Sequence, residues 1–483
     1  MGYKNTNIGI QFSIFITTAL LLLYLINFLN ILNISDRVLI GLMLAIFFWA
    51  YFNAGYAGMA FSHPYRLYLL VFFLFNMNGF AYCLLSNSDF FDFSFGAYSK
   101  GIFTNFVRTE TLFSIAFFLI SIHAGALISI RLAKIKIDAK NFNLLDCMPE
   151  NSNAKKVGII LFLLFLIPSY YYYFTIITEA YLIGGYQEYV NSEPIGTQEL
   201  PLIIRSSKDF FIFGFWLYLS GLPSKRNLIF VIIFYITPFI LLSIFTGSRV
   251  SAVSQCIAIL VYLTMIKRIN NSNILIISIA MFFFAGFVGA MRTQLDYDIV
   301  ALSDSINAKS SNPVEDTILQ LGASAHTISL TVASVENNTI NHSIMFFLEP
   351  FFGQTGYQPG KAAAEYVYLA DRLSYYYMND FMYGSGTGSS IVAEFYAVGG
   401  MIGVILIPFA YIICFFWMMT RINGSVSFLF FLVLLPGFFY TARSHPLTPI
   451  LFAKHQIILI IIYIGVNWLF KMTLSDQHTK SIE

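Results

Sequence analysis

A single carboxylate, Glu394, stands at the start of a long apolar run, directly after a stretch rich in glycine and serine. Residues 384–403 read GSGTGSSIVAEFYAVGGMIG. A carboxylate in such a place can take the proton of an attacking hydroxyl, which is the role of a general base. It can equally be the partner of a nearby arginine. Both interpretations of Glu394 stay open here, and Tyr396 beside it joins the candidate substrate-binding residues.

Five arginines lie at the ends of apolar runs, where a planar guanidinium suits bidentate binding of phosphate oxygens. Arg249, in SIFTGSRVSA, follows a tight turn at which backbone N–H groups could bind the same anion. The other four are Arg205, Arg292, Arg372 and Arg443. All five are candidates for binding a diphosphate or a glycan.

Each arginine also has a structural interpretation. Arg249 can cap a helix end or snorkel to the interface, and Arg292 can anchor the interface. Arg205 can form an ion pair with Asp209, one helical turn further on. Arg372 can pair with a neighbouring aspartate.

The segment TARSHPLTPILFAKHQ brings further ionisable groups close together in the sequence, among them His445, Lys454 and His455. His445 is a second candidate for the catalytic base. Lys454 and His455 fall inside an apolar run, where ionisable side chains point to function because their burial is costly. Lys454 is therefore a substrate-binding candidate, although it can also snorkel.

Composition places these groups in a membrane protein. Hydrophobic residues make up 58% of the 483 residues and charged residues only 11%, whereas soluble domains are about one-quarter charged. The net charge of +2 indicates no nucleic-acid partner. The four cysteines are far apart, which indicates neither a disulfide framework nor a zinc site. We expect no metal and no cofactor.

Hydropathy predicts an all-α, polytopic protein with about twelve transmembrane helices, since about 20 apolar residues cross a bilayer. The predicted spans are 9–33, 38–61, 66–85, 111–130, 157–177, 208–222, 228–246, 250–266, 273–291, 395–419, 425–441 and 449–470. The chain therefore divides into spans one to nine (1–291), a large loop (292–394), and the last three spans with a tail (395–483).

The distribution of charge orients these spans. Segments on the side of both termini hold 15 Lys and Arg against 5 Asp and Glu, and the opposite side holds 11 against 20. The positive-inside rule therefore places both termini in the cytoplasm and the large loop outside. That loop contains many Leu, Ile, Phe and Tyr, so we expect a partly helical cap on the outer face.

The glycines around Glu394 have their own predicted roles. GSGTGSS lacks the lysine of a phosphate-binding P-loop and reads as a flexible hinge where the loop returns to the membrane. Gly399 and Gly403 form a GxxxG pair, which predicts close packing against another helix.

In the order of these features the chain resembles the Wzy-type O-antigen and oligosaccharide repeat-unit polymerases and the related O-antigen ligases. Those proteins share many helices, a large late outer loop and outer arginines. They also share a motif of His, then Asn, Ser or Gln, nine residues, and GxxG. Ser389 and Ser390, followed by nine residues and Gly400–Gly403, fit this spacing. The first position is Ser389 rather than histidine, so Glu394 or His445 would have to supply the base.

The resemblance implies a bacterial inner-membrane enzyme with a periplasmic active face. It would transfer a growing glycan from undecaprenyl diphosphate to the terminal sugar of another lipid-linked repeat, without metal or nucleotide. Its partners would be undecaprenyl-diphosphate-linked oligosaccharides, membrane lipid and a chain-length regulator.

Three other functions are alternatives for a membrane protein with many helices. A lipid-linked oligosaccharide flippase or another secondary transporter would need charges near the midplane of several spans, and here the charges collect at one face. A glycosyltransferase with an acidic motif in its first outer loop fits poorly, since that loop is only NISDR. A membrane acyltransferase would need a catalytic histidine within a helix, for which His123 is the candidate.

Overall fold

The computed structural model describes most of the hydrophobic segments. Described are residues 2–29, 31, 34–92, 102–132, 151–182, 199–246, 249–266, 321–322, 324–348, 365–366, 368–377 and 387–480, with isolated positions at 318, 351 and 362 and between 269 and 288. All regular elements in these ranges are helices, which confirms the predicted all-α class.

The described elements comprise ten long helices and seven shorter ones. The long ones are α1 (Gly2–Phe28), α2 (Asp36–Tyr56), α5 (Asn105–Leu132), α6 (Ser152–Leu182), α9 (Leu202–Ser220), α10 (Lys225–Thr246), α11 (Arg249–Met265), α18 (Ile391–Thr420), α19 (Ser425–Tyr440) and α20 (Thr448–Lys480). The shorter ones are α3 (Pro64–Asn76), α4 (Asn78–Ser86), η1 (Phe90–Asp92), α15 (Ser324–Glu336), α16 (Met345–Leu348), α17 (Leu369–Tyr377) and η6 (Thr441–Arg443).

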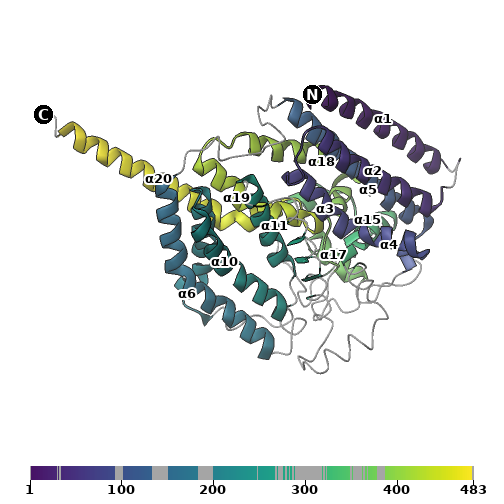
Figure 1. Cartoon of the computed structure of the whole chain (residues 1–483). Coiled ribbons are helices and arrows are strands. Elements are labelled where there is room, and N and C mark those ends of the chain that lie inside the picture. Colours follow the sequence, from purple (N-terminus) through teal and green to yellow (C-terminus); the bar gives the residue numbers. More distant parts are fainter. Residues whose placement is uncertain are drawn as a thin grey trace.

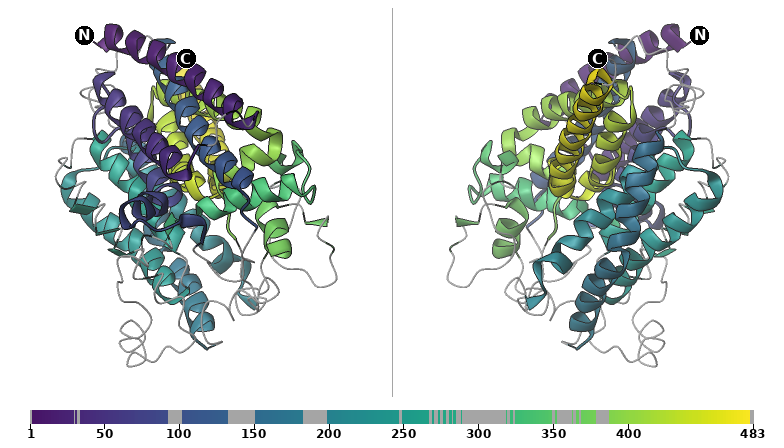
Figure 2. Two further views of the ribbon diagram at one scale, coloured as in Figure 1. Left: turned by 90° about the vertical axis from the view of Figure 1, so that its right-hand side faces the viewer. Right: turned by 90° about the vertical axis from the view of Figure 1, so that its left-hand side faces the viewer.

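These helices form one bundle (Figures 1 and 2). Helix α1 lies at one edge, and the C-terminal end of α20 projects from the opposite side of the bundle (Figure 1). Eight described helices are long and apolar enough to cross a membrane, and the bent pair α3 and α4 would make nine. The pair bends by 57° at Met77. Most of the predicted span 273–291 lies outside the described residues, so the count of twelve stays a prediction.

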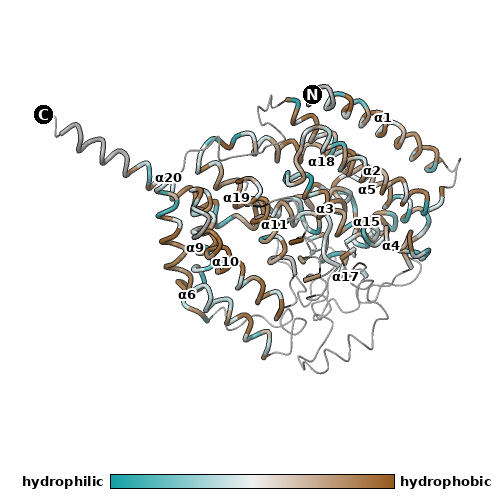
Figure 3. Tube along the Cα trace, viewed as in Figure 1, coloured by the Kyte–Doolittle hydropathy of each residue, from teal (hydrophilic) through white to brown (hydrophobic). Residues whose placement is uncertain are grey.

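The outside of the bundle is apolar, as expected of a surface that faces lipid. Hydrophobic residues run along α6 and α10 (Figure 3). On α6 the side chains of Ile167 and Phe174 are 78% and 65% exposed. Such exposure would be costly in water and is favourable in a bilayer.

The centre of the bundle is α5, which packs against α18, α2 and α1. Its Gly125 lets α18 approach closely, because a Cβ there would lie 2.4 Å from Ile412 and 2.8 Å from the carbonyl oxygen of Phe409. Small residues of this kind allow the close helix contacts that stabilise membrane bundles.

The segment predicted as an outer cap contains α15, α16 and α17, and α15 lies deep in the bundle. Residues 324–334 are buried, and the helix packs against α5 and α18. A helix that is buried all round belongs to a core rather than to a surface layer. Part of this loop therefore fills the interior beside the spans.

Helix α18 begins at Ile391, four residues before the predicted start, so Glu394 lies in its first turn. The helix is broken at Gly399 (φ −157°, ψ 27°) and Gly400 (φ 58°, ψ −146°). A Cβ at Gly403 would lie 2.3 Å from the carbonyl oxygen of Phe395, on the other side of the break, and no atom lies within 4 Å of a Cβ at Gly399. The predicted packing of Gly399 and Gly403 against another helix is therefore wrong. The glycines instead permit the break.

Gly400→Ala tests this break. The conformation of Gly400 is essentially restricted to glycine, and a Cβ there would lie 3.2 Å from Nε2 of His342. We expect a loss of about 1–3 kcal/mol in the free energy of unfolding, measured by thermal unfolding in detergent micelles. Gly41→Ala in α2 is the control: nothing lies within 4 Å of its Cβ, and alanine favours a helix. If both variants unfolded at the same temperature, the idea that Gly400 is required at the break would be contradicted.

Candidate functional site

Glu394 lies in the first half of α18, which is buried. Residues 391–397 are all buried, and Glu394 itself is 2% exposed. Its Oε1 accepts a hydrogen bond from Oγ of Ser389, while its Oε2 is buried without a hydrogen-bond partner in the described part of the chain. No ion pair joins Glu394 to a described arginine or lysine. A buried carboxylate without a cation is costly, so stability alone does not explain this residue.

Asn76 joins the start of α18 to two other elements. It ends α3 at the bend and is fully buried. Oγ of Ser390 donates to Oδ1 of Asn76 over 2.8 Å, and Nδ2 of Asn76 donates to the carbonyl oxygen of Ala442 in η6 over 2.7 Å. One side chain thus fixes the approach to Glu394 against the turn between α19 and α20. Arg443 follows Ala442 at this junction, with its guanidinium 5.8 Å from the ring centre of Phe75.

His445 holds the same turn to α16. Its Nδ1 accepts from the backbone N–H of Leu447 over 3.0 Å, so Nε2 carries the proton and donates to the carbonyl oxygen of Phe346 over 2.8 Å. Burial lowers the pKa of His445 to about 4, and the hydrogen bond to Phe346 only partly opposes this. The ring is neutral at neutral pH, and both nitrogens are already engaged by backbone groups.

Arg372 is tied to the same region through Phe346. Its Nε and Nη2 donate to the carbonyl oxygen of Tyr366 over 3.2 and 2.8 Å. The guanidinium also lies 5.2 Å from the ring centre of Phe346, the residue whose carbonyl binds His445. Arg372 therefore lies on the α16 side of the turn that carries Arg443.

The approach to Glu394 is fixed rather than free where the structure describes it. The backbone N–H of Thr387 donates to Oγ of Ser374 in α17 over 2.9 Å, and the hydroxyl of Thr327 in α15 donates to the carbonyl oxygen of Thr387 over 3.1 Å. Residues 387–390 are thus bonded to three helices, α15, α17 and α3, while the flexible hinge itself stays a prediction. Residues 384–386 lie outside the described part.

Tyr396 contacts a carboxylate that the sequence reasoning missed. Its hydroxyl donates to Oε1 of Glu110 in α5 over 3.1 Å. The hydroxyl of Tyr24 in α1 donates to the same oxygen over 3.2 Å. Glu110 is 5% exposed. The signal available in the sequence was a lone acid at the start of the apolar run TETLFSIAFF, the same pattern that singled out Glu394.

The remaining cationic candidates lie elsewhere or outside the described residues. Arg205 is exposed on α9, and its expected partner Asp209 instead binds His455 of α20, with Oδ2 3.0 Å from Nδ1. Lys454 is exposed on α20. Arg249 is the first residue of α11, but its side chain is not described, and Arg292 lies outside the described residues.

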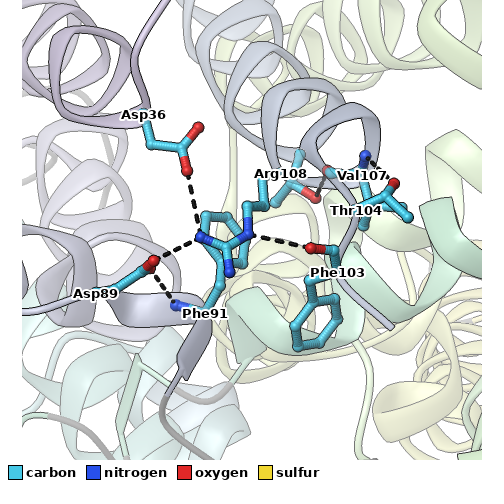
Figure 4. A network of polar contacts seen from close by, with 8 residues as sticks. Asp36, Asp89, Phe91, Phe103, Thr104, Val107 and Arg108 are labelled. Atoms are coloured by element: carbon cyan, nitrogen blue, oxygen red, sulfur yellow. Dashed lines mark hydrogen bonds and ion pairs between the residues drawn. The ribbon is translucent and has the colours of Figure 1, made fainter. Parts of the chain in front are cut away.

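Arg108, which was not among the sequence candidates, has a structural role. Arg108 of α5 contacts Asp89 at 2.5 Å and Asp36 at 3.6 Å (Figure 4). Its Nε donates to the carbonyl oxygen of Phe103 over 3.1 Å. These contacts fix the first turn of α5 against the start of α2 and the segment that follows α4.

Together these contacts place a buried carboxylate with one unpartnered oxygen beside a junction that carries Arg443 and, through Phe346, Arg372. Such a site can accept a proton from a hydroxyl and bind an anion. Among the described residues, no group of three or more His, Cys, Asp or Glu is arranged to hold a metal ion.

Comparison with known families identifies the protein class. A model of the family described as O-antigen polysaccharide polymerase Wzy matches residues 10–473, nearly the whole chain. The chain belongs to this family. No curated protein and no solved structure matches it.

Membership confirms the resemblance drawn from the sequence. This Wzy-family protein is a multi-pass membrane enzyme that polymerises lipid-linked oligosaccharide repeat units in O-antigen synthesis.

The acyltransferase alternative also loses its candidate residue. His123 is fully buried, with Nδ1 3.0 Å from the hydroxyl of Tyr65 and Nε2 3.0 Å from Oδ1 of Asn53. Both nitrogens are satisfied, as in a structural histidine.

His445→Asn tests the structural role of His445 through pH. The folded pKa of about 4 lies below the ordinary value of 6.5. The unfolded chain therefore takes up the proton first, and this contribution to stability is full above pH 6.5 and is lost as pH falls toward 4. Asparagine can still accept from the N–H two residues on but does not titrate. We expect it to lose about 1 kcal/mol at neutral pH and to show a smaller fall in unfolding temperature between pH 6.5 and 4.

The other buried histidines are present in both proteins, so the difference between the two pH curves isolates His445. Parallel curves would show that the ring is not held neutral by its surroundings.

Proposed function

We propose that this enzyme transfers a growing glycan from undecaprenyl diphosphate to the terminal sugar of a second lipid-linked repeat unit, with Glu394 as the general base. The observation that carries the proposal is the buried, unpartnered Oε2 of Glu394 at the start of the broken helix α18. Ser389 holds the other oxygen, so the orientation of the carboxylate is set before substrate binds.

The proposed reaction is a single displacement. The acceptor hydroxyl attacks the anomeric carbon of the donor glycan, and its proton passes to Glu394. The bond between that carbon and the diphosphate oxygen breaks, and undecaprenyl diphosphate leaves with the bonding electrons. Arg443 and Arg372 neutralise the negative charge that develops on the leaving group, which requires neither metal nor nucleotide.

The other candidates keep the roles that the sequence predicts, apart from His445. Arg249 and Arg292 are proposed to extend the diphosphate site, and Arg205 and Lys454 to contact phosphate or glycan at the rim. His445 is proposed to position the turn that carries Arg443, since both of its ring nitrogens are engaged.

We also propose that this end of the bundle faces the periplasm and that both termini face the cytoplasm. The support is the excess of Lys and Arg in the segments on the side of the termini, 15 against 5 Asp and Glu. A chain-length regulator would then act at the periplasmic end. The contacts from Asn76 to Ser390 and Ala442 show which helix ends share that end.

Glu394→Gln should abolish long glycan chains. Removing a general base typically slows a reaction by about 10²–10⁴-fold, while the amide keeps the size of the side chain. The variant is expressed in a host lacking the native protein, and the surface glycan is separated by length on a gel. Single repeats should replace the ladder. Glu365→Gln, an exposed acid of the same outer segment, should keep the full ladder. A normal ladder from Glu394→Gln would overturn the base assignment.

The carrier and the absence of a metal requirement are tested with purified enzyme. Supplied with lipid-linked repeat units, it should release one undecaprenyl diphosphate for each linkage formed. Removal of divalent ions with EDTA should leave that rate unchanged, because arginines rather than a metal stabilise the leaving group. Loss of activity with EDTA and recovery on adding Mg²⁺ or Mn²⁺ would contradict the proposed chemistry.

A further inference from the structure

A second polar site lies between α1 and α5, and Glu394 is not among its lining residues. It is a pocket of about 510 Å³, lined from α1 by Tyr24, Asn27 and Phe28 and from α5 by Asn105, Thr109 and Glu110. This volume lies within the range of small-molecule sites, about 300–1,000 Å³. None of its lining residues takes part in the proposed reaction.

The geometry of Glu110 leaves one carboxylate oxygen for a ligand. The hydroxyls of Tyr24 and Tyr396 both donate to Oε1, over 3.2 and 3.1 Å. No described side chain forms a hydrogen bond with Oε2, and this atom is not fully buried. The ring of Tyr24 is itself held by an edge contact to Phe113 at 5.3 Å. The carboxylate is thus oriented from one side and open to the pocket from the other.

The lining suits a sugar and disfavours a phosphate. A carboxylate, two amides and a hydroxyl supply acceptors and donors for sugar hydroxyls, and Tyr24 and Phe28 supply flat apolar faces. The nearest cation in the sequence, Arg108, already contacts Asp89 and Asp36. The pocket therefore presents negative charge, which would repel a diphosphate.

The pocket is connected to the buried half of α18. Tyr396 lies two residues after Glu394, and side chains at that spacing point to different sides of a helix. Glu394 faces Ser389, and Tyr396 faces Glu110. The first turn of α5, which carries Asn105 and Thr109, is fixed by the Arg108 contacts (Figure 4).

We propose that this pocket binds the acceptor glycan, with sugar hydroxyls donating to Oε2 of Glu110. The inference rests on the proposed function and adds the acceptor's binding site to it. Glu110 is a positioning residue: it holds the acceptor so that its attacking hydroxyl reaches Glu394. The diphosphate of the donor lies on the other side of α18, at the turn that carries Arg443.

The test is direct binding of a lipid-free oligosaccharide to the protein in nanodiscs. The probe is one repeat unit, released from its lipid carrier by mild acid, and affinity is measured by titration calorimetry. The Glu110→Gln variant should bind the probe about tenfold or more weakly, because it loses a hydrogen bond to a charged group. The amide oxygen can still accept from both tyrosines, so the unfolding temperature should stay unchanged. With lipid-linked substrate, the variant should raise KM for the acceptor more than it lowers kcat.

Three further variants complete the experiment. Asn105→Ala alters an exposed residue of the pocket rim and should weaken binding, which decides the matter if Glu110→Gln fails to fold. Glu365→Gln should bind like the original protein. Glu394→Gln should bind the probe yet make no polymer.

Unchanged affinity in folded Glu110→Gln, or no saturable binding by the original protein, would overturn the acceptor pocket. Polymer formation by Glu394→Gln would instead overturn the base assignment and leave the pocket standing.

Discussion

Backbone N–H and C=O groups inside a bilayer have no water to bond, so every break in a membrane helix must find its partners within the protein. The described residues contain two such breaks, between α3 and α4 at Met77 and within α18 at Gly399 and Gly400. At the second, the backbone N–H of Ser343 donates to the carbonyl oxygen of Ala397 over 3.1 Å. Asn76, at the first, bonds Ser390 and Ala442. Glu394 lies in the segment between Ser390, which Asn76 bonds, and the break at Gly399 and Gly400.

This constraint gives a structural meaning to the spacing of the sequence motif. Ser389 and Ser390 lead into α18, and Gly400 to Gly403 follow nine residues later. Those nine residues are the buried first part of the helix and its broken end. A longer or shorter segment would separate the seryl contacts to Glu394 and Asn76 from the break. In this chain the nine-residue spacing of the motif therefore corresponds to the length of the helix segment before the break. This segment carries Glu394 on one side and Tyr396 on another.

Most of the fold follows from hydropathy, whereas the partners of the polar residues do not. Apolar runs located the long helices, although the ends differ by up to ten residues, as at the end of α20. The lone acid Glu394 stood out by contrast with its surroundings. The contacts of Asn76 and Glu110 join residues 86 to 366 positions apart, for which a single sequence carries no signal. Gly399 and Gly400 were ambiguous for another reason: glycine serves both close packing and a break, and only the backbone angles distinguish the two. The neutral state of His445 follows from its burial, and its tautomer follows from two backbone groups, one of them 99 residues away.

The two buried carboxylates differ in a way that separates their roles. Glu110 has two tyrosine hydroxyls on one oxygen and a pocket beside the other, so its geometry is fixed and its free oxygen is accessible. Glu394 has one seryl partner, and its second oxygen is buried without one. A group that binds gains from rigid partners and an open face. A carboxylate that must accept a proton is a stronger base when it has few hydrogen-bond donors, because each such bond stabilises the ionised form. In the proposed mechanism, the same half-helix therefore separates the binding of the acceptor, to which Tyr396 contributes through Glu110, from its deprotonation by Glu394.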